Sequence, residues 1–364
     1  MNIVKPTLLI DESICKSNIR KMTDKAEANG LIFKPHFKTH QSHDVGRWFK
    51  EVGVEHITVS SLGMADYFSK DGWKNITVAF PCNIRQIDLI NDLASRINLT
   101  VLVDNAEIID LLSSQLNYDL GVKIELDSGK GRTGVNAKDL AVIDQLVNKV
   151  KSFERLHFNG FYLHAGHSYG ARSEAEITKI YTEAIKCLKP IKSAYPDAEI
   201  CYGDTPTCSV IDKFECIDAM SPGNFVFYDI MQEQIGSCVM EEVGVAVACP
   251  IVSINSQNNQ VCIYGGGVHF AKDVIQVDGH NSFGQIVKVS SDGWSAPVKG
   301  VYLKSVSQEH GLIYMPDEEL SKWKVGDVIG VLPVHSCMTA DCLGEYQTFE
   351  GTVLDHYSKK MHAN

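Results

Sequence analysis

A lysine-containing segment near the start of the chain is the first feature that could perform chemistry. Residues 34–40 read Lys-Pro-His-Phe-Lys-Thr-His, so lysine stands at the tip of an apolar run beside two histidines. A lysine amine in a partly desolvated, cationic setting has a lowered pKa and can form a Schiff base with an aldehyde. The alternative is an ordinary solvated lysine in a loop. The position of a lysine at the end of a strand, taken alone, favours this alternative.

A glycine-rich segment follows a later apolar run. Residues 125–134 contain a GxGxxG pattern together with Lys130 and Arg132. A dinucleotide site needs a following strand that ends in an acid roughly twenty residues on, whereas the next apolar run here ends in His164. The two basic side chains suit an anionic or phenolate oxygen, and a purely structural glycine turn is equally compatible with the pattern.

Two short turns rich in glycine and hydroxyl groups lie farther along the chain. Residues 203–207 read Gly-Asp-Thr-Pro-Thr, and residues 221–224 read Ser-Pro-Gly-Asn. Such turns can direct backbone N–H groups onto a phosphate. Each alone is more typical of an ordinary turn. Their joint position after the last two expected strands of a barrel favours a phosphate site.

A histidine and a cysteine, His335 and Cys337, stand two positions apart near the C-terminus. In an extended segment 333–339 the two side chains would point to the same side and could bind one metal ion. Two N/S donors describe an open site that favours Zn²⁺. Spacing alone favours a buried cysteine near an incidental histidine, because structural zinc has four ligands. Only Asp341 and Cys342 are near enough in sequence to add donors.

The elements that must position these residues follow an alternating pattern. Eight short apolar runs are separated by longer segments with apolar residues three and four apart, which predicts parallel strands joined by helices. Eight such units indicate a (β/α)₈ TIM-like barrel, with a doubly wound sheet as the alternative. The expected strands are 31–38, 56–61, 75–80, 99–104, 122–127, 158–164, 199–202 and 219–221, and the expected helices include 84–97, 106–116, 137–150 and 174–194.

The pattern changes after about residue 236. Helical periodicity disappears, and β-branched runs separated by Gly and Asn turns predict a C-terminal antiparallel β-barrel domain. We therefore expect a barrel domain over residues 1–235, whose first ten or so residues can pack with the β domain, and a β domain over 236–364 that carries the metal pair. The expected strands there are 243–255, 261–264, 285–290, 298–306 and 328–332.

Composition narrows the functional classes. The 364 residues include 34 basic and 45 acidic side chains, a formal net charge of -11, which argues against nucleic acid or anionic membranes as partners. The first apolar run is too short for a signal peptide or a membrane span, so we expect a cytoplasmic protein. Eleven cysteines without a CxxC pair indicate reduced thiols rather than disulfides.

Together these motifs resemble the fold-type III pyridoxal phosphate enzymes, specifically the D-serine dehydratase and D-threonine aldolase family related to alanine racemase. Residues 34–40 resemble the family's RPHxKTH segment, 127–134 its DxGxxRxG segment, 203–207 its GGTPT loop, and His335 with Cys337 its HxC metal pair. The chain departs from the family pattern at several positions. It has Lys34 where the family has Arg, Gln41 where a Lys is common, and Asp204 in place of the second Gly, and its stretch 264–273 also differs.

The resemblance implies a role for each matched residue. Lys38 is implied to bind the aldehyde of pyridoxal 5'-phosphate and to act in catalysis, and His335 and Cys337 to bind zinc. Because thiolate selects zinc whereas a carboxylate suits manganese or magnesium, Cys337 favours a dehydratase over an aldolase. The implied cofactor-binding residues are Lys38, Arg132, His164, Tyr169, Gly203, Thr205, Thr207, Gly223 and Asn224.

The implied function is that of a D-serine dehydratase-like lyase dependent on pyridoxal phosphate and zinc. It would eliminate water from a β-hydroxy-D-amino acid and give a 2-oxo acid and ammonia. The alternatives are a metal-dependent D-threonine aldolase that performs retro-aldol cleavage and a non-catalytic protein that carries pyridoxal phosphate. We expect a small D-amino acid as substrate and, from the resemblance, a homodimer.

Overall fold

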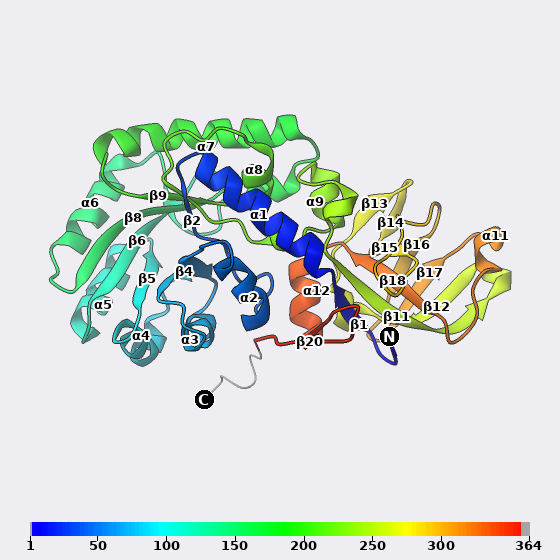
Figure 1. Cartoon of the computed structure of the whole chain (residues 1–364). Helices are drawn as coiled ribbons and strands as arrows, with labels where there is room; N and C mark the ends of the chain where they lie inside the picture. Colours follow the sequence, from blue (N-terminus) through cyan, green and yellow to red (C-terminus); the bar gives the residue numbers. More distant parts are fainter. Residues whose placement is uncertain (1, 358–364) are drawn as a thin grey trace.

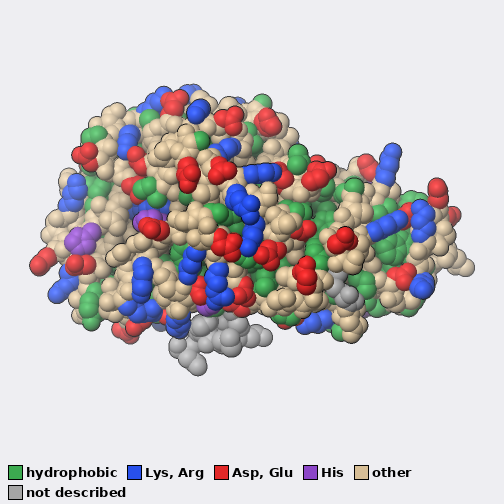
Figure 2. All heavy atoms as spheres, in the orientation of Figure 1, with side chains coloured by type: hydrophobic (Ala, Val, Ile, Leu, Met, Phe, Trp, Pro, Cys, Tyr) green, Lys and Arg blue, Asp and Glu red, His purple; other side chains and the backbone are tan. Residues whose placement is uncertain are grey.

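The structure is a computed structural model that describes residues 2–357 of the chain. It consists of two lobes side by side, a barrel covered by helices and a mostly β lobe (Figure 1). The helix α1 (Glu12–Ala28) extends from the barrel toward the β lobe, and α12 (Ser336–Leu343) lies at the junction. On the face shown in Figure 2, acidic and basic side chains are interspersed over both lobes.

Eight parallel strands form the barrel, in the order β2-β10-β9-β8-β6-β5-β4-β3. The segment after β2 completes the ring, because His36 forms a parallel bridge with Thr58 on β3. This closure confirms the predicted (β/α)₈ barrel and excludes the doubly wound sheet. All eight predicted strands are present: β2 (Ile32–Phe33), β3 (His56–Val59), β4 (Asn75–Pro81), β5 (Asn98–Val103), β6 (Leu120–Asp127), β8 (Leu156–His164), β9 (Ile200–Gly203) and β10 (Ala219–Met220).

Helices follow the barrel strands and cover their outside (Figure 1). A polar side chain precedes most of them and accepts a backbone N–H of the first turn, as Ser42 does from Val45 and Asn105 from Ile108. These caps satisfy otherwise unpaired donors and fix where each strand-to-helix turn ends. The helices are α2 (His43–Lys50), α3 (Leu62–Lys70), α4 (Ile87–Ala94), α5 (Ala106–Gln115), α6 (Leu140–Lys151), α7 (Glu174–Ala194), α8 (Thr205–Val210) and α9 (Ile230–Ile235).

The β lobe contains a closed ring of six antiparallel strands, β11-β12-β17-β16-β15-β18 and back to β11. The N-terminal strand β1 (Thr7–Ile10) pairs antiparallel with β11, so the chain starts in this lobe before it enters the barrel. The ring confirms the predicted antiparallel β barrel. Its strands are β11 (Val245–Asn255), β12 (Gln260–Tyr264), β15 (Gly284–Val287), β16 (Tyr302–Val306), β17 (His310–Tyr314) and β18 (Val328–Pro333). Outside the ring this lobe has β13 (Ile275–Val277), β14 (His280–Ser282), β19 (Tyr346–Gln347) and β20 (Val353–Leu354), whereas β7 (Val135–Asn136) pairs with β6 of the barrel.

The β lobe also contains short helices, namely α10 (Gly267–Phe270), α11 (Asp317–Leu320) and α12. One expectation about this lobe was wrong. The segment 333–339 is not extended, because β18 ends at Pro333 and α12 begins at Ser336. The carboxylate of Asp229 accepts the backbone N–H of Ser336 at 2.9 Å and its hydroxyl at 3.1 Å, which holds the first helical turn in place.

Two further findings concern the cysteines and the helices. All eleven cysteines lie within residues 2–357 and each is a free thiol, as predicted. No helix in this part of the chain combines the length and the apolar character that a membrane span needs.

Candidate active site

Lys38 lies at the mouth of the barrel, in the turn between β2 and α2. The backbone of this turn is fixed against β3, because the N–H of Phe37 donates to the carbonyl of Thr58. Within residues 2–357 the Nζ of Lys38 has no hydrogen-bond partner. Burial lowers the pKa of Lys38, the charge of Arg132 adds to this effect, and Cys337 opposes it. The structure therefore presents an unpartnered amine that is more readily deprotonated than an ordinary lysine.

The side chain of Lys38 lines a cavity of about 220 Å³. The walls come from both lobes, since residues at the carboxyl ends of barrel strands meet the start of α12 there. A second cavity of about 250 Å³ shares His36, Lys38, Arg132 and His164 with the first and extends toward β4. Eight predicted site residues line the first cavity: Lys38, Arg132, His164, Tyr169, Gly223, Asn224, His335 and Cys337.

The mouth of the barrel has a positive electrostatic character. Lys38, Lys130 and Arg132 all line the first cavity. Burial, together with the charge of Lys38, lowers the pKa of His164 to about 3, and burial also holds the pKa of His36 well below its usual range. Both imidazoles are therefore neutral near pH 7 and can accept or donate a hydrogen bond. The cavity is therefore suited to an anionic ligand.

The two predicted phosphate turns approach each other after β9 and β10. The hydroxyl of Thr205 accepts the N–H of Gly223 at 3.3 Å, and the N–H of Thr205 donates to the hydroxyl of Tyr169 at 3.4 Å. A Cβ atom on Gly223 would lie 2.9 Å from the carbonyl oxygen of His36, so only glycine fits at this position. Gly203, Thr205 and Thr207 are buried behind the wall of the cavity, which Asp204, Gly223 and Asn224 form.

Asp204 occupies the position where the resembled family has glycine. Its backbone has a φ of 149°, a conformation that costs a non-glycine residue free energy. One carboxylate oxygen, Oδ1, accepts the N–H of Thr207 at 2.7 Å and the hydroxyl of Ser168 at 2.8 Å. The other oxygen is buried and has no partner among the described residues. Burial raises the pKa of Asp204 to about 7, so the carboxyl group is partly protonated near neutral pH.

His335 and Cys337 meet although the segment is not extended. His335 is the residue before α12 and Cys337 lies in its first turn, so both side chains line the cavity. Burial opposes ionisation of the Cys337 thiol, but the neighbouring His335 outweighs burial and lowers the pKa of the thiol. The Nδ1 of His335 lies 3.2 Å from Oδ2 of Asp273. The pair thus provides an imidazole and a thiol with thiolate character, the donor set that zinc prefers.

The pair has no further metal ligand close by. Within residues 2–357 no group of three or more His, Cys, Asp or Glu side chains could hold a metal ion together. A metal ion on His335 and Cys337 would therefore keep positions open for water or substrate. Asp273 contacts the other ring nitrogen of His335, which would fix the orientation of the imidazole toward a metal.

Three residues of this region were not predicted as site residues. Glu125 lines the second cavity, its Oε2 is buried without a partner in the described chain, and burial raises its pKa. Thr39 lies 3.2 Å from Cys337, and Asp273 contacts His335. The two-residue alternation of strand β6 could have identified Glu125, which lies two positions before Asp127. Nothing in the sequence pairs Thr39 or Asp273 with residues so far away.

Family models match two segments of the chain. The alanine racemase N-terminal domain matches residues 10–228, and the putative serine dehydratase domain matches residues 244–349. The first segment contains all strands of the (β/α)₈ barrel, and the second contains the six-stranded ring with His335 and Cys337.

Several proteins are similar to this chain. The D-serine dehydratase of Dictyostelium discoideum is 26% identical over 394 residues, which covers 99% of this chain and 98% of that protein. The D-threo-3-hydroxyaspartate dehydratase of Delftia sp. strain HT23 is 24% identical over 94% of this chain and 93% of that protein, and its structure superposes with a TM-score of 0.86 at 98% coverage of both chains. A cysteine-to-alanine mutant of a D-threo-3-hydroxyaspartate dehydratase, solved in a metal-free form, superposes with a TM-score of 0.87 at 22% identity and 98% coverage of both chains. The 3-hydroxy-D-aspartate aldolase of Paracoccus denitrificans is 30% identical over 172 residues, 45% of this chain and 43% of that protein.

Proposed function

Because this chain belongs to the D-serine dehydratase and D-threonine aldolase family of alanine racemase-like proteins, we propose that it eliminates water from a β-hydroxy-D-amino acid. The chain is a pyridoxal phosphate-dependent lyase. Water would then hydrolyse the imine that elimination leaves, so the proposed products are a 2-oxo acid and ammonia. D-serine is our first candidate substrate, since the similarity to a D-serine dehydratase extends over nearly the whole of both chains.

The residues at the mouth of the barrel fit pyridoxal phosphate. Lys38 offers an unpartnered amine for its aldehyde, and Arg132 a cation for its phenolic oxygen. The backbone of Gly223 lies against His36 too closely for any side chain, and the buried Oδ1 of Asn224 has no partner among the described residues. When bound, the cofactor withdraws electrons from the substrate and makes the hydrogen on its Cα acidic.

The pair His335 and Cys337 fits zinc. An imidazole and a thiolate match the ligand preference of Zn²⁺, and the open positions leave room for a substrate hydroxyl. Zinc bound there would act as a Lewis acid on the β-hydroxyl group and make it a better leaving group. The proposal of a metal at this pair is supported by the donor set and by the metal-free form described for a related dehydratase.

The chain's own residues position the substrate and move its protons. Lys38, whose pKa is lowered, is the base that accepts the proton from the substrate Cα. Lys130 and Arg132 attract the anionic groups to this end of the barrel. Thr39 and Asn224 contact the Sγ of Cys337 at 3.2 and 3.4 Å and hold it beside the cavity. The start of α12 covers part of the cavity and limits access of bulk water.

One observation supports this proposal above the others, namely that Lys38 and Cys337 line the same cavity although they come from different lobes. A proton acceptor for Cα and a metal site for the β-hydroxyl are the two groups that β-elimination needs. A protein that only carries pyridoxal phosphate needs the first group and not the second.

The purified holoenzyme should be assayed with D-serine, D-threonine and D-threo-3-hydroxyaspartate, with L-serine as the matched control. We expect 2-oxo acid and ammonia in equal amounts from at least one D-substrate and none from L-serine. Retro-aldol cleavage is the second candidate reaction, favoured by the similarity to the Paracoccus aldolase. Formation of glycine together with an aldehyde would identify it. Absence of both product types with all three D-substrates would contradict the proposal.

The assembly is a separate proposal. We propose a homodimer, which light scattering on the purified protein would test against a monomer. The cytoplasmic location and the absence of nucleic-acid and membrane partners stay predictions from composition.

A further inference from the structure

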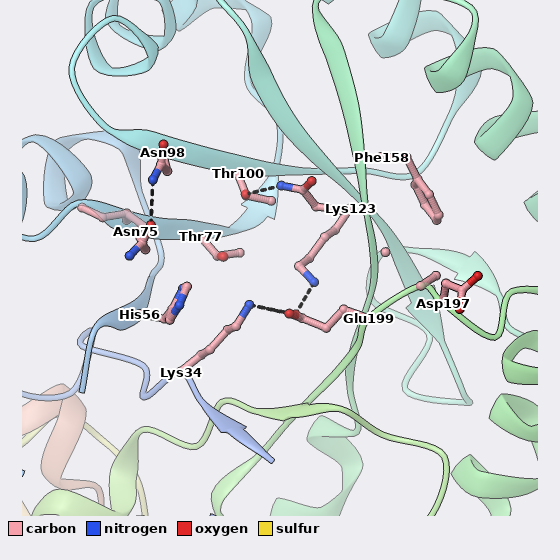
Figure 3. Close-up of a pocket in the computed structure, with 14 residues that line it drawn as sticks. Lys34, His56, Asn75, Thr77, Asn98, Thr100, Lys123, Phe158, Asp197 and Glu199 are labelled. Atoms are coloured by element: carbon pink, nitrogen blue, oxygen red, sulfur yellow. Dashed lines mark hydrogen bonds and ion pairs between the residues drawn. The ribbon is translucent and has the colours of Figure 1, made fainter. Parts of the chain in front are cut away.

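A third cavity, which is polar, lies at the opposite end of the barrel from Lys38 and is distinct from the two cavities at its mouth. It has a volume of about 320 Å³ and opens among the amino ends of the strands (Figure 3). Its rim includes the first residues of three neighbouring strands, His56 on β3, Asn75 on β4 and Asn98 on β5. The proposed reaction uses none of these residues, since catalysis in a (β/α)₈ barrel takes place at the carboxyl ends of the strands.

Two lysines and one glutamate meet inside this cavity. The Nζ of Lys34 lies 2.9 and 2.7 Å from the two carboxylate oxygens of Glu199, and the Nζ of Lys123 lies 2.5 Å from Oε1. Figure 3 shows both ammonium groups directed at the same carboxylate. The side chains of Lys34 and Lys123 are only 9% and 2% exposed. Burial of two ammonium groups is costly unless their charge is compensated.

Glu199 compensates only one of the two positive charges. Burial opposes its ionisation, but Lys123 and Lys34 outweigh burial and lower its pKa, so it is a carboxylate. Burial and the charge of Lys34 lower the pKa of His56, which is therefore neutral at pH 7. The buried group thus carries one positive charge in excess. Asp197 lies at the rim and is exposed to solvent, where water screens its charge.

The cavity also offers hydrogen-bond donors that the protein does not use. An ammonium group has three N–H donors, and Lys123 directs one of them at Glu199. Thr77 is a buried residue that lines the cavity, and its hydroxyl group has no hydrogen-bond partner among the described residues. Excess positive charge and spare donors in one hollow are the features of an anion site.

We propose that this cavity binds a small oxyanion between Lys34, Lys123 and the hydroxyl of Thr77. Inorganic phosphate and a short carboxylate both present negatively charged oxygens, and either fits the volume of the cavity. The proposal is independent of the reaction at the other end of the barrel. Because Lys34 directly follows β2, Lys123 lies on β6 and Glu199 directly precedes β9, a bound anion would tie three parts of the barrel together.

Binding should therefore stabilise the folded protein by mass action. The holoenzyme, whose active-site phosphate position is filled by cofactor, should be titrated with inorganic phosphate at constant ionic strength set by NaCl. The thermal unfolding midpoint and the heat of binding are measured. We expect a saturable rise of the midpoint with phosphate. Parallel titrations with sodium acetate distinguish a carboxylate site, which responds to both anions, from a phosphate-selective one.

Two variants of the charged group are expected to act in opposite directions. Lys123→Met removes the excess charge and spare donors and should weaken phosphate binding by about tenfold or more. Glu199→Gln leaves two positive charges and should strengthen phosphate binding by about tenfold. Lys74→Met changes an exposed lysine at the same end of the barrel, outside the cavity, and should leave the dissociation constant unchanged.

The signs of these effects decide between an anion site and a structural ion pair. If Lys123→Met binds phosphate as tightly as the parent, or if the parent responds to phosphate no more than to chloride, the proposal is wrong. Should Lys123→Met fail to fold, Glu199→Gln still decides, because a purely structural ion pair gives no reason for tighter phosphate binding after loss of the carboxylate.

Discussion

The hydroxyl oxygen of Thr39 lies 3.2 Å from the Sγ of Cys337, although 298 positions separate the two residues in the chain. Thr39 is the neighbour of Lys38, so this contact sets the position of the proposed reactive amine relative to the thiol. Tyr346 reinforces the same junction, because its hydroxyl donates to the carbonyl of His40. The two lobes therefore meet at the proposed site residues, and a site built on Lys38 cannot be separated from the β lobe.

Replacement of Cys337 by alanine should abolish elimination without loss of the cofactor. The thiol is a proposed metal ligand, whereas Lys38 and the phosphate turns belong to the barrel. Because a Lewis acid at the leaving group contributes several kcal/mol, we expect kcat for 2-oxo acid formation to fall by about 100-fold or more. Product assays and the visible absorbance of the bound cofactor are the two measurements.

Cys262→Ala is the matched control for that experiment. Cys262 lies on β12, away from both cavities at the mouth of the barrel. We expect it to leave turnover and metal content unchanged. Equal turnover in the Cys337 variant and this control would show that the thiol holds no catalytic metal.

Asp273→Asn should weaken metal binding while the two proposed ligands stay in place. The carboxylate of Asp273 lies 3.2 Å from Nδ1 of His335 and orients the ring. Loss of such a partner typically reduces metal affinity by about 10–100-fold. Zinc content after dialysis against graded chelator concentrations measures this, and added zinc should restore turnover. Asp278→Asn, in the turn between β13 and β14, is the control; a Zn²⁺ affinity for Asp273→Asn equal to that control would contradict the role.

The sequence predicted the strands of the barrel because short apolar runs mark them, as in β6, where all residues except Asp127 are buried. It also identified most residues of the mouth, since strand ends in a (β/α)₈ barrel converge irrespective of how far apart they lie in the chain. Lys38, Arg132 and Asn224 meet for that reason. The same reasoning did not identify α12, because the interaction that starts it comes from Asp229, more than a hundred residues earlier.

Contacts between polar residues that lie far apart in the chain could not be predicted from the sequence either. Asp273 and His335 meet only after the β ring has closed, and no periodicity records that contact. Lys34, Lys123 and Glu199 occupy three separate strand segments and face one another only inside the completed barrel. Apolar periodicity reports which side of an element is buried, but it does not report which charged groups share the buried space.

Asp204→Asn should change the pH dependence of stability. Burial raises the pKa of Asp204 to about 7 in the folded chain, above the value of about 3.9 in an unfolded one. The folded state therefore retains a proton that the unfolded state releases. The stability that this proton gives is fully present below about pH 4 and is lost as the pH rises to about 7, at roughly 1.4 kcal/mol per pH unit.

Asparagine keeps the acceptor for the N–H of Thr207 and has no charge to bury. We expect the variant to be increasingly more stable than the parent from about pH 4 to 7, with a constant difference above pH 7. Unfolding midpoints of the cofactor-free protein, measured across this range, test the sign. Asp212→Asn, at an aspartate that is 92% exposed, serves as the control. Parallel profiles for parent and Asp204→Asn would show that the buried carboxyl group does not titrate as described.

Gly223→Ala should disturb the cofactor site through its backbone. A Cβ atom at this position would lie 2.9 Å from the carbonyl oxygen of His36 and 3.1 Å from the hydroxyl of Thr39, so the turn that carries Lys38 must shift. Overpacking of this kind costs about 1–3 kcal/mol. We expect a lower unfolding midpoint and loss of pyridoxal phosphate on gel filtration, measured by absorbance. Gly293→Ala adds the same methyl group where no heavy atom lies within 4 Å and should change neither quantity. If Gly223→Ala retains its cofactor as Gly293→Ala does, the close approach of these two turns is not needed to hold the phosphate.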